Sequence, residues 1–446
     1  MSDLLDLARR VAARARPGEQ VEAFVARSRR FTVKAYGGAV ESLTSAEPAG
    51  IGVRVVRDRR QGFAHAGTLD PSVLDEVLAE ARDNLAFGEP DEWYGLAEPD
   101  GVPLPVLTLT DPALAAFAPE RKVALALELE RAAVSADQRV SGVRQAQYGD
   151  ARGEAALATS TGIEGWSEST ACWLSVSALA PDGERTQIGS GLSVGRGPGE
   201  LDVTRAAAEA ADRATRLLGA RPVPARRLPV VLERRVAASF LAIVVGTLTG
   251  DRVLKGRSPF AHRVGEAIAS PLVTLVEDPT NPASYGADTT DGEGLATRPT
   301  TLVHEGVLRS FLHDTYTGRR SGHGSTGSAV RGYSSTPTVG SVALQPVPGT
   351  ATLEELCAEV GEGLLVLGVS GLHSGVNAVS GDFSVGAEGQ LIEGGVPGRP
   401  VREVTIASTI QRMLLDVMAV GGDVEYLPGG DTGVSLALRD VSLSGA

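Results

Sequence analysis

The sequence predicts an α+β fold in two domains, the first over residues 1–220 and the second over residues 221–446. The chain holds 54 glycines and 25 prolines among 446 residues, about 18% where roughly 12% is average, and this excess indicates many turns. Polar and apolar residues alternate around glycines over residues 139–193, as in antiparallel strands. Between such segments lie a few amphipathic stretches with helical spacing.

The first domain should combine an antiparallel sheet with helices. Leucine and valine recur at helical spacing over residues 3–15, before Pro17 and Gly18, which predicts a short helix. Strands are expected at 31–36, 50–56 and 62–65, the last two forming a hairpin. Asp70 and Pro71 supply an N-cap and a first-turn proline for a helix that continues to Leu85. Further helices are predicted at 119–135 and about 200–218, and the proline-rich segment 88–119 as a connector or wrapped arm.

The second domain should start after the arginine- and proline-rich stretch 221–227. It is predicted to be mostly strands and glycine turns, with helices at 353–360 and 407–417. The expected strands cover residues 228–232, 272–276, 303–311, 363–369 and 382–386.

Charge and cysteine content limit the function classes. A net charge of −13 and a pI near 5.1 disfavour a non-specific nucleic-acid binder. Two cysteines, Cys172 and Cys357, cannot form a disulfide framework and indicate a reducing compartment. No apolar stretch approaches the ~20 residues of a membrane span, and the first residues resemble no signal peptide. We therefore expect a soluble cytoplasmic protein.

The residues alone define no catalytic constellation. His304 and Glu305 begin like H-E-x-x-H, but Leu308 stands four positions after His304 and Gly306 favours a hairpin turn, so we expect no zinc site there. The glycine-rich stretch 321–327 lacks the spacing and the lysine of a P-loop. His313, His323 and His373 could converge, although separately hydrogen-bonded histidines are the simpler expectation.

Several phrases, in this order along the chain, together resemble the TldD/PmbA family, and specifically its PmbA-like (TldE) branch. They are Gly50-Ile51-Gly52-Val53-Arg54-Val55, Gly62-Phe63-Ala64, Gly250-Asp251 with Lys255-Gly256-Arg257-Ser258, Ser270-Pro271-Leu272, Asp291-Gly292-Glu293-Gly294 with Thr297-Arg298, Gly306-Val307-Leu308 with Asp314-Thr315-Tyr316-Thr317, Ser325-Thr326-Gly327, Gly375-Val376-Asn377, Ser380-Gly381-Asp382-Phe383-Ser384-Val385-Gly386-Ala387, and Pro400-Val401-Arg402-Glu403-Val404-Thr405-Ile406-Ala407. The resemblance covers nearly the whole chain.

The resemblance implies an N-terminal α/β domain and a C-terminal barrel-like, mostly antiparallel β domain. It also implies a heterodimeric metallopeptidase whose TldD-type subunit carries H-E-x-x-x-H on a helix. In this chain the corresponding helix would be about 235–251, which contains no histidine, glutamate or cysteine. Alkyl side chains do not bind zinc or iron. We therefore expect no metal and no catalytic residue in this chain, and zinc or iron in the partner.

The leading hypothesis is a non-catalytic subunit that completes a TldD/TldE peptidase acting on unfolded peptides or peptide-like natural-product precursors. The expected partners are a TldD-type subunit or a second copy of this chain, and an extended peptide bound along a strand edge. The resemblance favours five candidates for the substrate-facing wall: Asp382, Phe383, Asn377, Arg319 and Thr326.

Two alternatives stay open. The chain could be a homo-oligomeric protein that binds peptides without cutting them. It could also be an autonomous hydrolase that uses His313, His323, His373 or Asp382. Metal content and copurification with an H-E-x-x-x-H partner would separate the three.

Overall fold

A computed structural model describes residues 3–445, and it has the predicted α+β architecture. The N-terminal region is one antiparallel seven-stranded sheet. Six of its strands follow the order β4-β3-β1-β5-β6-β7, and the seventh, β2, pairs with the C-terminal half of β1. Its strands are β1 (Gln20–Tyr36), β2 (Ala39–Ala46), β3 (Ala49–Arg57), β4 (Arg60–Ala66), β5 (Gly142–Thr159), β6 (Glu164–Asp182) and β7 (Arg185–Gly195).

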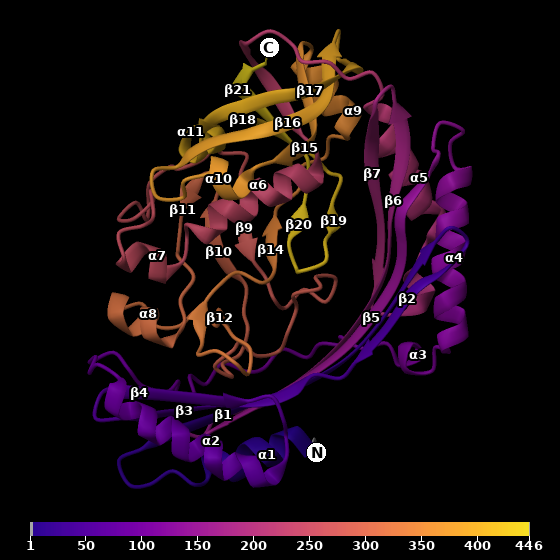
Figure 1. Ribbon diagram of the computed structural model, residues 1–446. Helices are drawn as coiled ribbons and strands as arrows, with labels where there is room; N and C mark the ends of the chain where they lie inside the picture. The colour runs from indigo at the N-terminus through magenta and orange to yellow at the C-terminus, as the bar shows by residue number, and fades with distance from the viewer. Residues whose placement is uncertain (1–2, 446) are drawn as a thin grey trace.

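Helices cover the outer side of this long, bent sheet in two groups (Figure 1). Helices α1 (Asp3–Ala12) and α2 (Pro71–Asp83) pack on one end of the sheet around a core that includes Val53. Helices α4 (Pro119–Ser135) and α5 (Val203–Arg216) pack on the other end around a second core that includes Tyr148. The C-terminal region sits in the angle of the bent sheet.

The C-terminal region contains a closed five-stranded barrel. It closes because β17 pairs with both β16 and β21, and its one parallel pairing joins β8 to β15. The barrel strands are β8 (Arg226–Leu232), β15 (Gly363–Ser370), β16 (Asp382–Glu393), β17 (Val396–Thr409) and β21 (Leu436–Ser444), with β18 (Val417–Val420) added outside β21. Helix α6 (Arg234–Gly246) packs in the same apolar core as the barrel strands. There the rings of Phe240 and Phe383 contact each other edge to face, with their centroids 5.9 Å apart.

Short elements connect these units. They are η1 (Asn84–Phe87), α3 (Pro112–Ala115), η2 (Pro198–Glu200), α7 (Gly250–Leu254), β9 (Leu275–Glu277), β10 (Thr300–His304), β11 (Val307–Leu308), α8 (Thr315–Ser321), β12 (Ala329–Val330), β13 (Thr338–Val339), β14 (Leu344–Pro346), α9 (Leu353–Val360), α10 (Leu372–Gly375), α11 (Ile410–Leu415), β19 (Glu425–Tyr426) and β20 (Thr432–Gly433). No helix within residues 3–445 is long and apolar enough to cross a membrane.

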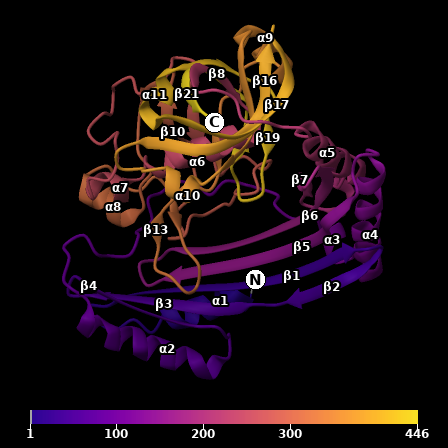
Figure 2. The same cartoon turned by 45° about the horizontal axis from the view of Figure 1, so that its top comes forward.

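The segment between β12 and β13 reaches the N-terminal sheet (Figure 2). A Cβ on Gly52 of β3 would lie 2.2 Å from the carbonyl oxygen of Tyr333, and one on Gly50 would lie 2.4 Å from the Tyr333 ring. These two glycines therefore allow the C-terminal region to pack directly on the strand backbone.

The structure confirms the α+β class and refines several element boundaries. The strand predicted at 31–36 is the end of the 17-residue β1. The helix predicted over 407–417 begins only at Ile410, because β17 continues to Thr409. The stretch 235–251 divides at Thr247, the C-cap of α6. The domain division at 220/221 stays a prediction.

Candidate functional site

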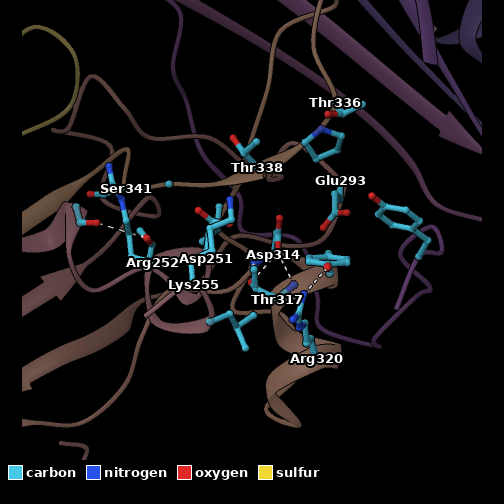
Figure 3. Close-up of a pocket in the computed structure, with 18 of the residues that line it drawn as sticks. Asp251, Arg252, Lys255, Glu293, Asp314, Thr317, Arg320, Thr336, Thr338 and Ser341 are labelled. Carbon is cyan, nitrogen blue, oxygen red and sulfur yellow. Dashed lines mark hydrogen bonds and ion pairs between the residues drawn. The ribbon is translucent and has the colours of Figure 1, made fainter. Parts of the chain in front are cut away.

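A cavity of about 820 Å³ lies between the N-terminal sheet and the C-terminal region. Strands β3 and β4 contribute Arg54 and Gln61, and the connector contributes Tyr94. The remaining wall comes from α6, α7, α8, the loop around Glu293 and the segment 336–341 (Figure 3). This size suits a short peptide or another small ligand.

A buried charge network reaches the side of the cavity nearest the sheet through Arg54 and Glu293. Arg54 lies opposite Glu22 in the β1–β3 register and donates to both of its carboxylate oxygens, from Nε at 3.0 Å and Nη2 at 2.9 Å. Arg54 Nη2 also lies 3.5 Å from Glu293 Oε1, and Arg331 contacts Glu22. All four side chains are buried. The network therefore joins the sheet to two C-terminal loops.

Burial and charge act in opposite directions on the pKa of Glu22. Burial alone would raise it, but the neighbouring Arg54 and Arg331 cations outweigh burial and hold the pKa below its ordinary value. Glu22 is therefore ionised and balances the two guanidinium groups. Such a network costs desolvation when it forms and is strongly destabilising when one partner is lost.

The loop that carries Glu293 is organised by Asp291. Asp291 Oδ1 accepts from the backbone N–H groups of Glu293 at 2.9 Å and Leu295 at 3.0 Å, and Oδ2 accepts from Ala329 at 3.1 Å. Burial, assisted by the nearby Glu293 charge, raises the pKa of Asp291 to about 7. Burial also raises the pKa of Glu293, whose Oε2 accepts from the N–H of Thr315 at 2.8 Å.

Helix α8 forms the next part of the wall. Its N-cap, Asp314, accepts at Oδ1 from the Thr317 backbone N–H at 2.8 Å and hydroxyl at 2.7 Å. The Tyr316 hydroxyl donates to Asp91 and accepts from Arg320, both at 2.8 Å. The ring centroids of Tyr94 and Tyr316 are 5.6 Å apart. This wall is therefore polar, aromatic and largely hydrogen-bonded within the protein.

Helices α6 and α7 form another part of the wall, and the start of α7 packs beside the residues that precede α8. Helix α6 presents Ala242 and Gly246 to the cavity. The ammonium group of Lys255, the C-cap of α7, pairs with Asp251 at 2.7 Å. Arg252 on the same helix is exposed.

A strand edge completes the cavity. All six residues 336–341 line it, and within the described chain β13 pairs only with β12. The N–H of Gly340 donates to the carbonyl oxygen of Ser328. In an antiparallel pair, residues that are hydrogen-bonded to the partner strand alternate with residues that are not. The N–H and C=O groups of the preceding residue, Val339, therefore point away from β12. Ala329, the residue opposite Val339, also directs its backbone away from the pair, towards Asp291 and Gly292. The cavity therefore borders an unpaired strand edge.

Family models match the chain in three consecutive parts. They describe PmbA/TldA metallopeptidase domain 1 at residues 21–85, the central domain at 112–218 and the C-terminal domain at 225–445. The chain belongs to the PmbA/TldA (TldD) metallopeptidase family. Its fold and its candidate site can therefore be compared directly with other PmbA/TldD proteins.

The relatives bear names from both branches of the PmbA/TldD family. The chain is 26% identical to Metalloprotease PmbA of Escherichia coli O157:H7, over 95% of this chain and 92% of that protein. It is 28% identical to a Metalloprotease TldD homolog of Haemophilus influenzae, over 80% and 76% respectively. The crystal structure of TldE from Thermococcus kodakarensis has the same fold, with a TM-score of 0.90, 23% identity and 99% coverage of both chains.

The residues at this PmbA/TldD cavity do not fit a catalytic metal. Ala242 and Gly246 on α6 offer no donor atom. Over residues 3–445, no three His, Cys, Asp or Glu side chains are grouped so that they could hold a metal ion.

Of the three candidate histidines, His313 is buried, whereas His323 and His373 are exposed. The rings of His313 and His323 stack with centroids 5.9 Å apart, and His373 is exposed on α10. His313 Nδ1 lies 3.3 Å from the Thr317 hydroxyl. Burial, with the nearby His323, lowers the pKa of His313 to about 4, so its ring is neutral near pH 7.

Three of the predicted substrate-facing residues lie together at the start of β16. Asn377 Oδ1 accepts from the backbone N–H groups of Val379 at 3.0 Å and Ser380 at 3.3 Å. Asp382 accepts from the Ser380 hydroxyl at 2.6 Å. Phe383 is 4% exposed in the barrel core. The first two anchor a turn, the third packs in the core, and none of them lines the cavity.

The other two predicted residues, Arg319 and Thr326, form hydrogen bonds with backbone groups close to α8. Arg319 donates to the carbonyl oxygen of Leu96 at 2.7 Å. The Thr326 hydroxyl accepts from the His313 N–H at 2.8 Å and donates to the His313 carbonyl at 3.0 Å. Neither residue lines the cavity. A role for the five residues in substrate binding stays a prediction.

Sequence reasoning did not single out the residues that do form the cavity. Arg54, Asp251, Glu293 and Asp314 all occur in the phrases that carry the family resemblance. Those phrases gave no reason to place residues 54 and 293 in contact. They meet where the C-terminal region packs on the sheet.

Proposed function

We propose that this chain is the TldE/PmbA-like, non-catalytic subunit of a two-subunit TldD/TldE peptidase, with zinc or iron bound by the TldD-type partner. The substrates would be unfolded peptides or peptide-like natural-product precursors, cleaved at amide bonds in the cytoplasm. The observation that carries this proposal is the α6 wall, where Ala242 and Gly246 stand at the cavity on the helix that the family resemblance equates with the metal-binding one.

The free edge of β13 supports the peptide part of the proposal. An extended peptide can add to such an edge through main-chain hydrogen bonds, which accept many sequences. A folded protein cannot present an unpaired strand inside a cavity of about 820 Å³. The substrate would therefore be flexible or unfolded.

A leave-one-out assay tests the proposal. Purified chain, TldD-type partner and an unfolded peptide are combined, and each component is then omitted in turn. Cleavage should require all three components, and the isolated chain should contain no stoichiometric zinc or iron by elemental analysis. Chelator-sensitive cleavage by this chain alone, or full activity of the partner without it, would contradict the proposal.

A proline series tests the binding mode separately. Proline removes one N–H donor and fixes φ, so a proline at a paired position of the peptide should slow cleavage. Alanine at the same position serves as the control. Equal rates for the two peptides would argue against main-chain pairing.

A further inference from the structure

Four basic side chains line the cavity, and three of them have partners within the protein. Arg54 is paired with Glu22 and Glu293. Lys255 pairs with Asp251, and Arg320 donates to Tyr316. For Arg252, no side-chain hydrogen bond, ion pair or ring contact is formed with any residue in 3–445. Its charge is therefore not used to hold the fold together.

The acidic side chains of the cavity show a similar division. Asp251, Glu293 and Asp314 each accept from a neighbouring group. Asp431 forms no side-chain hydrogen bond or ion pair within residues 3–445, and burial raises its pKa. It lies near Glu277, which accepts from the hydroxyl of Ser341 at 2.5 Å. Among the residues that the structure describes, the cavity thus has one cation and one anion whose side chains form no hydrogen bond or ion pair.

The two ends of the strand edge have different surroundings. In the view of Figure 3, Arg252 and Ser341 lie on the same side of the cavity, while Glu293 lies on the side of Thr336, the first residue of the segment 336–341. Main-chain pairing along β13 does not by itself fix which way a peptide runs or where it ends. A charge at one end of the strand edge would supply that information.

We propose that Arg252 binds a carboxylate group of the peptide lying along the free edge of β13, at the Ser341 end of the cavity. This inference rests on the proposed function and assigns a specificity-determining residue to the same site. A guanidinium offers paired N–H donors in a planar arrangement that matches a carboxylate. The carboxylate comes from the peptide's C-terminus or from an Asp or Glu side chain.

The surrounding charges favour a carboxylate over a phosphate. Asp251 and Asp431 line the same cavity and would repel a dianion more strongly than a monoanion. A peptide also carries backbone N–H groups, from which the unpaired Asp431 carboxylate can accept. One carboxylate with adjacent donors is therefore the ligand chemistry that complements this end of the cavity.

Fluorescence anisotropy with four labelled probes tests the inference on the full-length chain. The probes share an uncharged N-terminal fluorophore that has no carboxylate group and an apolar heptapeptide sequence. They end in a free carboxylate or an amide, each with or without one internal Asp. The wild-type chain should bind a carboxylate-bearing probe about 5-fold more tightly than the amide that lacks Asp.

Two variants separate Arg252 from general electrostatics. Arg252→Gln should abolish the preference for a carboxylate. Arg257→Gln removes the same charge from a nearby exposed residue outside the cavity lining, and it should keep the preference. Circular dichroism confirms that both variants are folded.

Every outcome of the binding assay is decisive. Preference for the free C-terminus or for the internal Asp identifies the source of the carboxylate and supports the inference. Equal binding of all four probes, loss of preference in both variants, or no binding to the wild-type chain overturns it. The leave-one-out assay gives its own answer, so the subunit role can survive the failure of this assignment.

Discussion

The two sides of the cavity use charged residues in opposite ways. On the side of the sheet, Glu22, Arg54, Glu293 and Arg331 contact one another and are buried. On the side of α7, Arg252 is exposed and has no partner within residues 3–445. The first group joins two regions of the fold, while Arg252 forms no side-chain hydrogen bond or ion pair within residues 3–445 that would do so.

This contrast indicates where a ligand would interact. Buried charges must be compensated internally, because an uncompensated charge in a low-dielectric interior is costly. An exposed charge is compensated by water until a ligand replaces that water. The sheet side should therefore respond to mutation through stability, and the α7 side through binding.

The largest effect is expected when the buried network loses its central anion. Glu22→Gln removes the carboxylate that faces both Arg54 and Arg331, and it should lower the free energy of unfolding by about 3–5 kcal/mol. Urea denaturation provides the measurement. Glu393→Gln, in the exposed pair with Arg399, is the control and should change stability by less than about 1 kcal/mol. Equal losses of unfolding free energy in the two variants would contradict the distinction between buried and exposed charges.

The sequence predicted the elements better than the site for a physical reason. A helix such as α2 is specified locally, since Asp70 caps it by accepting from Ser72 at 2.9 Å and Pro71 opens its first turn. The Glu22–Arg54 pair depends instead on strand register, and Glu293 joins only after the two regions pack. The spacing of polar and apolar residues along one sequence carries no information on such contacts.

The glycine-rich phrases were informative about family but not about contact with a ligand. Asn377 and Asp382 are polar residues between glycines because they hold a turn through side-chain to backbone contacts. Phe383 is apolar because it fills the barrel core against Phe240. The same residue types could equally line a binding site, and only the fold distinguishes the two uses.

The raised pKa of Asp291 predicts that the stability of the fold depends on pH. The folded-state pKa of Asp291 is raised to about 7, so its protonated form stabilises the fold at low pH. That contribution is lost as the pH rises through about 7. Asp291→Asn cannot ionise, and it should remove about 2–3 kcal/mol of the loss of stability that the wild type shows between pH 5 and pH 8.

Denaturation curves at pH 5, 6, 7 and 8 measure this difference. Asp100→Asn is the comparison, because the pKa of Asp100 is lowered, with Arg298 donating to it. This variant should not flatten the profile in that range. A wild-type profile matched by Asp291→Asn at all four pH values would show that Asp291 ionises normally.

The third prediction concerns the α8 cap on the cavity wall. Asp314→Ala removes the acceptor for the Thr317 N–H and should cost about 1 kcal/mol of stability. Thr352→Ala removes the equivalent cap of α9 and is the matched control. Similar losses in the two variants would show that Asp314 acts mainly as a cap. A much larger loss for Asp314→Ala would mean that the cavity wall depends on this charge as the Glu22 network does.

The smallest effect on stability is expected at Arg252. Its guanidinium forms no hydrogen bond or ion pair within residues 3–445, so Arg252→Gln should change the free energy of unfolding by less than about 0.5 kcal/mol. Urea denaturation of the variant beside Arg257→Gln checks this value. A loss above about 1 kcal/mol would reveal a structural partner for Arg252 and would place it with the charges of the sheet side. A neutral result, combined with the loss of carboxylate preference in the binding assay, would locate its role in the ligand complex, because a charge that does not stabilise the free protein can alter binding only through the bound state.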